Sequence, residues 1–340
     1  MITRAGGNHE NGYALRIDDL SVSAATAGGV VDVVSGVSFD LRPCEITALA
    51  GESGSGKTVT ALAVLRLHDV RTLRIRTGRI LVDGADMASA GPDVLRRIRG
   101  EKVSMVFQEP MNSIDPMYTV GSAIVEVIRA HQRVTRRAAL RQAGELLEHV
   151  GVPDPRNRLG AYPFELSGGL LQRVMIAMAI ANQPSVLIAD EPTTALDVTV
   201  QQQIMQLLRR LADEGMSILL VTHDLAVVSE YADTINVMYA GQIVESGPVR
   251  EVLSEPEHPY TAGLVGAVPD VANRRLELST IPGRVPPPDE FPAGCRFAPR
   301  CSFAEAECDA PVAQLFPREE RRVRCVRHAQ LSLEGVEPYA

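Results

Sequence analysis

Eight consecutive residues near the start of the chain have the types and spacing of a phosphate-binding loop. The segment Gly51-Glu-Ser-Gly-Ser-Gly-Lys57-Thr58 fits Gly-x-x-x-x-Gly-Lys-[Ser/Thr], in which glycines let consecutive backbone N–H groups turn toward phosphate oxygens. Lys57 would neutralise the β- and γ-phosphates of a nucleotide, and the Thr58 hydroxyl would ligate Mg²⁺. The residues expected to bind nucleotide here are Gly51, Glu52, Ser53, Gly54, Ser55, Gly56, Lys57 and Thr58.

Two carboxylates follow an apolar segment much later in the chain. Asp190 and Glu191 come directly after the predicted strand at 186–189. Asp190 would hold Mg²⁺ through water, and Glu191 would polarise an attacking water. A solvated strand end is the simpler interpretation of these two residues alone, and the phosphate loop makes the catalytic interpretation preferable.

These residues need a scaffold of strands and helices. The apolar pattern predicts a helix over 59–67 and strands at 15–17, 30–34, 37–41, 46–50, 102–107, 186–189 and 217–221. The early strands are predicted to form an antiparallel sheet. The later alternation of strands with helices predicts a parallel α/β core, into which the helical block at 110–165 is inserted.

Four further motifs occur in a fixed order. They are Gln108 at a strand end, Leu166-Ser-Gly-Gly-Leu-Leu-Gln-Arg173, Ala195-Leu-Asp197 and Thr222-His-Asp224. With the phosphate loop and Asp190-Glu191, this set resembles the ATP-binding cassette (ABC) ATPases over residues 14–255. The resemblance implies a P-loop ABC-type nucleotide-binding domain with a parallel sheet core, an antiparallel β subdomain and a helical subdomain at about 110–182.

The resemblance also implies roles for these residues in ATP hydrolysis. Glu191 would be the general base, His223 would clasp the γ-phosphate, and Gln108 would act in catalysis and as a Mg²⁺ ligand with Thr58 and Asp190. Cassettes pack head to tail, so the partner's ATP would be met by Ser167, Gly168, Gly169 and Asp197. A helix cap is the simpler interpretation of Ser167.

Three segments resemble one group within the family, the ATPase subunits of oligopeptide/dipeptide importers. They are Glu109-Pro-Met-Asn-Ser-Ile-Asp-Pro116, Glu257-His-Pro-Tyr-Thr261 with Ala267-Val-Pro269, and Pro292-Ala-Gly-Cys-Arg-Phe-Ala-Pro-Arg-Cys301. The resemblance implies that residues 256–340 form an importer-type extension and that 108–117, with the helical insertion, docks on a membrane permease. A solvated loop is the alternative for 108–117.

The implied assembly contains a second ATPase subunit (a paralogue or another copy), two permease subunits and, indirectly, a substrate-binding protein. The chain would then lie peripherally on the cytoplasmic face of the inner membrane and use ATP and Mg²⁺ to drive peptide import. Oligopeptides, dipeptides and nickel are not distinguished as cargo by the sequence. A soluble cassette acting on ribosomes or DNA and a catalytically silent cassette are the rival interpretations.

Four cysteines follow the proline-rich segment 281–290, which is predicted to be a stiff linker. Cys295, Cys301, Cys308 and Cys325 have gaps that fit zinc poorly but could suit a [4Fe–4S] cluster, and some importer relatives carry one at matching positions. A cluster is therefore expected, with zinc or unliganded thiols as the alternatives. Cys44, where the family usually has glycine, is interpreted as structural.

Composition narrows the function further. The net charge of −8 and aromatic content of 4% argue against nucleic acid as a partner. No apolar run reaches the ~18 residues that a membrane span needs, and the first residues lack a secretory h-region, so a soluble cytosolic chain is expected.

Ala24 stands where cassettes usually stack an aromatic ring on adenine, which predicts looser ATP binding.

Overall fold

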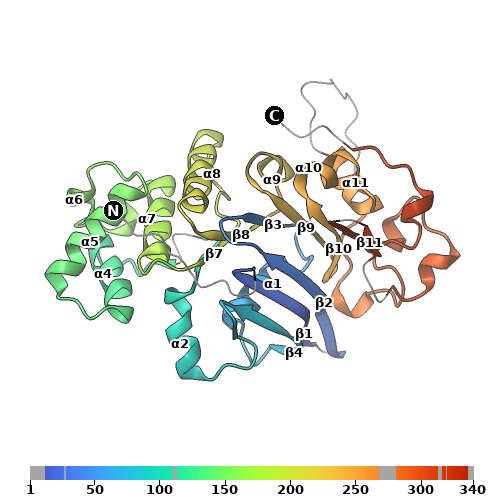
Figure 1. Ribbon diagram of the computed structural model, residues 1–340, viewed down its shortest axis with the longest axis horizontal. Helices are drawn as coiled ribbons and strands as arrows, with labels where there is room; N and C mark the ends of the chain where they lie inside the picture. The colour runs from blue at the N-terminus through green and yellow to red at the C-terminus, as the bar shows by residue number, and fades with distance from the viewer. Residues whose placement is uncertain are drawn as a thin grey trace. The chain divides into compact units, whose positions relative to one another are not determined.

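The computed structural model describes residues 12–26, 28–109, 113–267, 281–312, 316–318 and 320–335 (Figure 1). The chain divides into two compact units. Unit 1 contains Leu41–Glu45 and Leu81–Leu219 with the described residues before Arg16, and unit 2 contains Arg16–Asp40, Ile46–Ile80 and the described residues from Leu220 onward. The chain passes from unit 1 to unit 2 within strand β8 (Ser217–Thr222).

Long strands form the first sheet. In unit 2, β1 (Leu15–Thr26) lies between β2 (Gly29–Leu41) and β4 (Leu73–Val82). The last two residues of β4 belong to unit 1 and pair antiparallel with β5 (Ala85–Asp86). The prediction of separate strands at 30–34 and 37–41 is wrong, because Gly36 adopts a φ of 60° inside one continuous strand.

A second sheet in unit 2 carries the phosphate loop. The five residues of β3 (Ile46–Ala50) are all buried, and β3 pairs in parallel with β9 (Thr234–Tyr239). β10 (Gln242–Pro248) pairs antiparallel with β9, and β12 (Arg321–Val323) and β11 (Phe316–Arg318) extend the sheet beyond β10. The helices of this unit are α1 (Lys57–Leu65), α9 (Leu225–Tyr231), α10 (Val249–Ser254) and α11 (Pro259–Gly266).

Unit 1 contains a second parallel pair and a group of helices. β6 (Val103–Val106) pairs with β7 (Val186–Asp190), with Val106 opposite Ala189. The two parallel pairs confirm the predicted α/β core. The helices are α2 (Pro92–Glu101), α4 (Val120–His131), α5 (Arg136–His149), α6 (Pro155–Arg158), α7 (Gly168–Ile180) and α8 (Val198–Asp213), with a 3₁₀ turn at Pro163–Glu165.

Helices α4 to α7 gather in one group in Figure 1, in the stretch predicted to be a helical insertion. Threonines define where two of them begin. The Thr119 hydroxyl accepts the Ser122 N–H at the start of α4, and the Thr135 hydroxyl accepts the Ala138 N–H at the start of α5.

The C-terminal residues of unit 2 share a hydrophobic core with β9. The ring of buried Tyr239 lies 4.6 Å from Tyr260 on α11 and 5.2 Å from Phe297, measured between centroids. Ile281 and Val285 pack against the same core, so the proline-rich segment is an anchored connection and not a free linker. Short 3₁₀ turns follow at Pro288–Glu290, Ala298–Arg300, Ala306–Asp309 and His328–Gln330.

A buried ion pair joins β12 to β10. Arg321 Nη2 donates to Glu245 Oε1 at 2.7 Å, and the two side chains are only 8% and 1% exposed. The Glu245 carboxylate also accepts the N–H groups of Glu257 and His258. Burial raises the pKa of Glu245, and these hydrogen bonds oppose the rise. Removing one partner would leave a buried charge uncompensated, which typically costs about 3–5 kcal/mol.

His258 gives the fold a specific sensitivity to acid. This residue is buried at the N-cap of α11, where its Nδ1 accepts the Tyr260 N–H at 3.0 Å. Burial, together with the nearby Arg324 charge, lowers the pKa of His258 to about 3. The unfolded chain therefore binds a proton below about pH 6.5 that the folded chain does not bind, so stability falls as the pH falls.

We predict that His258→Asn removes this part of the acid sensitivity. The asparagine oxygen can replace Nδ1 as the cap acceptor but does not titrate. Between pH 6.5 and 5 the free energy of unfolding of the unaltered chain should fall by about 2 kcal/mol more than that of the variant. Denaturant unfolding at both pH values measures this, and equal pH dependence would show that His258 does not cause the loss.

Candidate phosphate-binding and hydrolysis site

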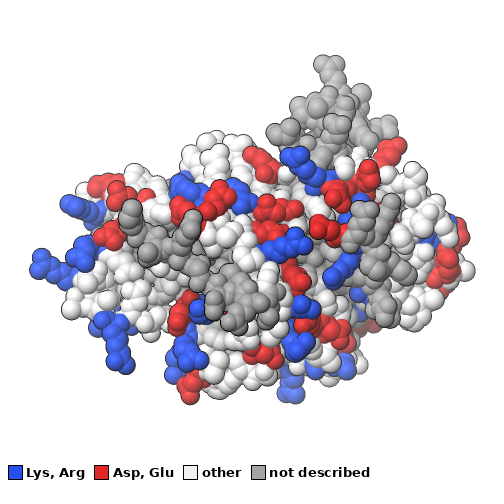
Figure 2. Space-filling view, in the orientation of Figure 1, with Lys and Arg blue, Asp and Glu red and all other residues white. Residues whose placement is uncertain are grey.

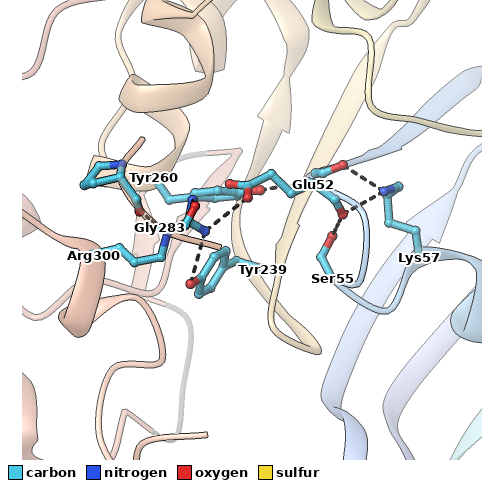
Figure 3. A network of polar contacts seen from close by, with 9 residues as sticks. Glu52, Ser55, Lys57, Tyr239, Tyr260, Gly283 and Arg300 are labelled. Atoms are coloured by element: carbon cyan, nitrogen blue, oxygen red, sulfur yellow. Dashed lines mark hydrogen bonds and ion pairs between the residues drawn. The ribbon is translucent and has the colours of Figure 1, made fainter. Parts of the chain in front are cut away.

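The predicted phosphate loop lies between β3 and the N-terminus of α1. The side chain of Lys57 is buried inside the loop, and its Nζ donates to the carbonyl oxygens of Gly51 at 2.7 Å and Glu52 at 3.0 Å (Figure 3). Ser55 bonds back to the Glu52 carbonyl through both its N–H and its hydroxyl. Gly241 N–H donates to the Ser55 carbonyl at 2.8 Å, which ties the loop to the turn after β9. Thr58 lies in the first turn of α1 with an exposed side chain.

Gly51 is the residue at which the loop requires glycine. Its φ is 152°, and a Cβ there would overlap the carbonyl oxygen of Met238 on β9. Gly54 also has a positive φ, 83°, but a Cβ there would meet no atom within 4 Å. The two glycines therefore share a backbone requirement, and only Gly51 also has a packing requirement.

Gln108 and Glu191 meet in unit 1. Gln108 follows β6 and Glu191 follows β7, so the parallel pairing of these strands brings both residues to the same edge. Gln108 Nε2 donates to Glu191 Oε2 at 2.8 Å, and the Thr194 hydroxyl donates to the same oxygen at 3.0 Å. Glu191 has a φ of 45°, a strained conformation of the kind that concentrates at functional positions. Asp190, the last residue of β7, is 2% exposed.

The sequence predicts roles for Gln108 and Glu191 separately but not the hydrogen bond between them. The signal was present, since both residues end strands of the predicted parallel core. Thr194 is not among the predicted site residues, and its sequence signal is its position three residues after Glu191.

The predicted signature residues begin helix α7. Ser167 occupies the N-cap position, but its side chain makes no capping hydrogen bond. Ser167 and Gly168 are exposed, while a Cβ at Gly169 would collide with Val200 on α8. Asp197 caps α8, where its Oδ1 accepts the Val200 N–H at 3.0 Å. The helix N-terminus is thus open to solvent at Ser167 and Gly168, while Gly169 packs against the start of α8.

His223 follows β8 and is exposed. The next residue, Asp224, caps α9 by accepting the N–H groups of Ala226 and Val227. His223 and the phosphate loop belong to unit 2, and the remaining predicted residues, Gln108, Ser167–Gly169, Asp190, Glu191 and Asp197, belong to unit 1.

The prediction of an iron–sulfur cluster is wrong. Within the described residues, which include all four C-terminal cysteines, no group of three or more His, Cys, Asp or Glu side chains could hold a metal ion. The cysteines line a cavity of about 10 Å³, roughly the space for one water molecule. Burial raises the pKa of the Cys295 and Cys301 thiols and raises that of Cys325 to about 11, which disfavours the thiolates that a cluster requires.

The remaining cysteine occupies a turn before β3. Cys44 is exposed, has a φ of 61° and donates its N–H to the Ser217 hydroxyl at 3.2 Å. A left-handed φ favours glycine, which accounts physically for the glycine expected there from the family resemblance.

The segment predicted to dock on a permease is described in part. Residues 110–112 lie outside the described residues, as do residues 268 and 269 of the Ala267-Val-Pro269 motif. Of the described part, Met117 is 80% exposed and Tyr118 is 55% exposed. Backbone hydrogen bonds from Val120 to Ala161 and from Gly121 to Leu159 bring this segment beside the turn before α7. That turn carries exposed Phe164 stacked on Tyr162 at 5.5 Å.

Comparisons with known proteins agree with this geometry. Residues 34–194 match the ABC transporter family, and residues 244–308 match the oligopeptide/dipeptide transporter C-terminal region. A protein of Brucella abortus named for peptide import and ATP binding is 50% identical over 92% of this chain and 94% of its own length. A second such B. abortus protein is 47% identical over 94% and 98% of the two chains.

Solved structures of cassettes have the same fold. A dimeric bacterial ABC transporter cassette is 26% identical, covers 69% of this chain and 99% of its own, and has a TM-score of 0.62. CbiO1 of Clostridium perfringens, part of the ABC transporter complex cbiONQ, is 26% identical, covers 71% of this chain and 90% of its own, and has a TM-score of 0.61.

The fold and the strand-end residues define an ATP-binding cassette ATPase with a P-loop nucleotide-binding domain. Within that class, the chain belongs to the ATP-binding subunits of the oligopeptide/dipeptide importer family.

We predict that Gly51→Ala destabilises the chain far more than Gly54→Ala. Both variants place a side chain at a positive φ, which costs about 1–2 kcal/mol, but only the first adds an overlap with backbone. The free energy of unfolding, measured with urea, should fall by about 3 kcal/mol for Gly51→Ala and about 1 kcal/mol for Gly54→Ala. Equal losses would contradict the packing requirement at Gly51.

Proposed function

We propose that this chain is the ATP-hydrolysing subunit of a membrane importer for oligopeptides or dipeptides, in which two cassettes close on ATP to drive translocation. The phosphate loop carries the proposal, because it buries the Lys57 ammonium group among its own carbonyls at the start of α1. Phosphate oxygens would compete with those carbonyls for the ammonium group and would meet the positive end of the helix.

The residues of unit 2 would bind the triphosphate. Lys57 would neutralise the β- and γ-phosphates, and backbone N–H groups of 51–58 would cradle them. His223, exposed at the end of β8, would contact the γ-phosphate. Ala24 on β1 has no aromatic ring to stack on adenine. Contacts with the phosphates would therefore supply most of the affinity for ATP.

Hard oxygen donors make Mg²⁺ the fitting metal. Thr58 in unit 2 offers a hydroxyl, and Gln108 and Asp190 in unit 1 offer an amide oxygen and a carboxylate. When bound, Mg²⁺ would neutralise negative charge on the phosphates.

Glu191 would act as the general base toward water. The hydrogen bonds from Gln108 and Thr194 hold its Oε2, and the strained backbone fixes the direction of the side chain. Fixing a base in this way lowers the entropy that it would lose in the transition state. Gln108 would therefore orient the base as well as contribute to the metal site.

The exposed start of α7 would serve the nucleotide of a second cassette. Ser167, Gly168 and Gly169 would present a hydroxyl and N–H groups to its γ-phosphate, and Asp197 would lie close by at the start of α8. The unused capping capacity of the Ser167 hydroxyl supports this role. The second cassette would be a paralogous ATPase or another copy of this chain.

The exposed apolar residues near α4 support docking on a permease. Exposed Met117 and Tyr118 directly precede Val120, whose N–H donates to the Ala161 carbonyl. Ala161 is next in sequence to the stacked pair Tyr162 and Phe164, and exposed apolar residues of this kind are typical of interaction sites. Two permease subunits and, through them, a substrate-binding protein would complete the complex.

We also propose the domain limits 14–255 for the cassette, with a helical subdomain at about 110–182, and 256–340 for the extension.

The chain would then lie peripherally on the cytoplasmic face of the inner membrane. Within the part of the chain that the structure describes, no helix has the length and apolar character to cross a membrane. Figure 2 shows acidic and basic side chains interspersed over the visible face. Mixed surface charge of this kind fits docking on a protein partner better than general binding to nucleic acid.

We predict that Glu191→Gln abolishes hydrolysis but preserves ATP binding. The amide keeps the shape of the side chain and cannot accept a proton, so the rate should fall on the order of 100-fold or more. Phosphate release measures the rate, and size-exclusion chromatography with ATP and the second ATPase subunit should show a stable pair. Glu145→Gln, an exposed change on α5, is the control. An unchanged rate would exclude Glu191 as the base, and absence of a pair would contradict closure on ATP.

We predict that Met117→Glu with Tyr118→Glu blocks peptide transport and leaves ATP binding intact. Charges at these exposed positions should block an apolar contact with the permease without touching the phosphate loop. Peptide uptake into proteoliposomes should fall at least about tenfold, while ATP binding by the isolated subunit stays unchanged. The matched control is the exposed pair Arg96→Glu and Arg97→Glu on α2, outside the helical insertion. Unaltered uptake would contradict docking through this segment.

A further inference from the structure

The C-terminal extension forms two hydrogen bonds to Glu52 of the phosphate loop. The Glu52 N–H donates to the Tyr260 hydroxyl at 2.8 Å, and Arg300 Nη1 donates to Glu52 Oε2 at 3.1 Å. Figure 3 shows the side chains of Arg300 and Tyr260 converging on Glu52, whose carbonyl on the other side accepts Lys57 Nζ. One loop residue therefore links the extension to the lysine expected to bind phosphate.

Arg300 is held rigidly by groups outside the loop. Its Nε donates to the Pro282 carbonyl at 2.7 Å, and Nη2 donates to the Gly283 carbonyl at 3.4 Å. Its guanidinium carbon lies 5.6 Å from the centre of the Tyr239 ring, whose hydroxyl lies 3.4 Å from Nη1. The side chain is only 7% exposed. A planar guanidinium fixed by this many partners loses little further freedom when it holds a carboxylate.

Glu52 has an electrostatic need for this partner. A carboxylate within a phosphate loop repels the phosphates unless its charge is compensated. Its Oε1 is buried and accepts no hydrogen bond, so compensation comes through Oε2 and Arg300. Burial lowers the pKa of Arg300, but its hydrogen bonds to Tyr239 and Glu52 outweigh that effect and the net shift is upward, so the guanidinium stays charged.

We propose that Arg300 is a positioning residue of the phosphate loop, which it serves by neutralising Glu52 while Tyr260 fixes the Glu52 backbone. The C-terminal extension thereby sets the affinity of the cassette for ATP. This inference rests on the proposed binding of ATP at residues 51–58.

The test compares ATP dissociation constants of the full-length chain and five variants, using a fluorescent ATP analogue with Mg²⁺. Arg300→Ala should weaken binding about tenfold, because Glu52 is then left uncompensated, and should raise KM with a smaller change in kcat. Arg300→Lys, which keeps the charge but not the planar fork, should fall in between. Glu52→Gln alone should bind ATP more tightly than the unaltered chain, because it removes the repelling carboxylate and leaves the Arg300 charge beside the phosphates.

The double variant Glu52→Gln with Arg300→Ala separates electrostatics from simple loss of structure. With no carboxylate left to neutralise, its affinity should return to within about threefold of the unaltered chain. The fifth variant, the control Arg327→Ala, removes an arginine of the extension that pairs with Glu305 and Glu307, far in the sequence from the loop. It should bind ATP normally.

Normal ATP affinity in Arg300→Ala would overturn the inference, and so would a double variant that binds no better than Arg300→Ala. Should Arg300→Ala fail to fold, Arg300→Lys and the double variant still decide the question in the same way. If the unaltered chain and Arg327→Ala both fail to bind ATP, the proposed function itself is wrong. The two failures are therefore distinguishable.

Discussion

The need to pair a buried ammonium group organises the phosphate loop. Lys57 is only 5% exposed, and its buried charge is tolerated because the Gly51 and Glu52 carbonyl oxygens accept hydrogen bonds from it. Those carbonyls can turn inward only where Gly51 passes closely over the Met238 backbone of β9. The conformation of the loop therefore depends on Lys57, Gly51 and β9 together. Tyr260 and Arg300 hold the loop from the C-terminal extension through hydrogen bonds to Glu52.

A comparable principle operates at the ends of β6 and β7. Parallel pairing carries Gln108 and Glu191 to one edge, where a hydrogen bond and a strained backbone fix the carboxylate. In both units, buried strands form the rigid part of the structure. The phosphate loop and Glu191 lie in the segments that directly follow these strands. This division lets short segments adopt unusual backbone conformations at a cost that the buried strands offset.

Much of this could be predicted from the sequence, because the motifs are local. The phosphate loop, the signature helix and the strand-end carboxylate each lie within about ten residues, where pattern and chemistry coincide. The contact between Glu52 and Arg300 joins residues 248 positions apart, and no periodicity points to it. The cluster prediction failed for a related reason, since the spacing of Cys295 to Cys325 carries no information about cavity size or burial. The sequence predicts two strands around Gly36, because glycine often interrupts a strand, but β2 continues through this residue.

The aromatic core formed by Tyr239, Tyr260 and Phe297 packs the C-terminal extension against β9 of the cassette. Arg296 adds to this by bonding the Ala240 carbonyl and the Ser35 hydroxyl. C-terminal extensions therefore cannot be exchanged freely between homologous transporters. A hybrid of one relative's extension with another's cassette would bring together aromatic side chains that do not fit each other. Substitutions on the two sides of this interface must therefore compensate for each other during evolution.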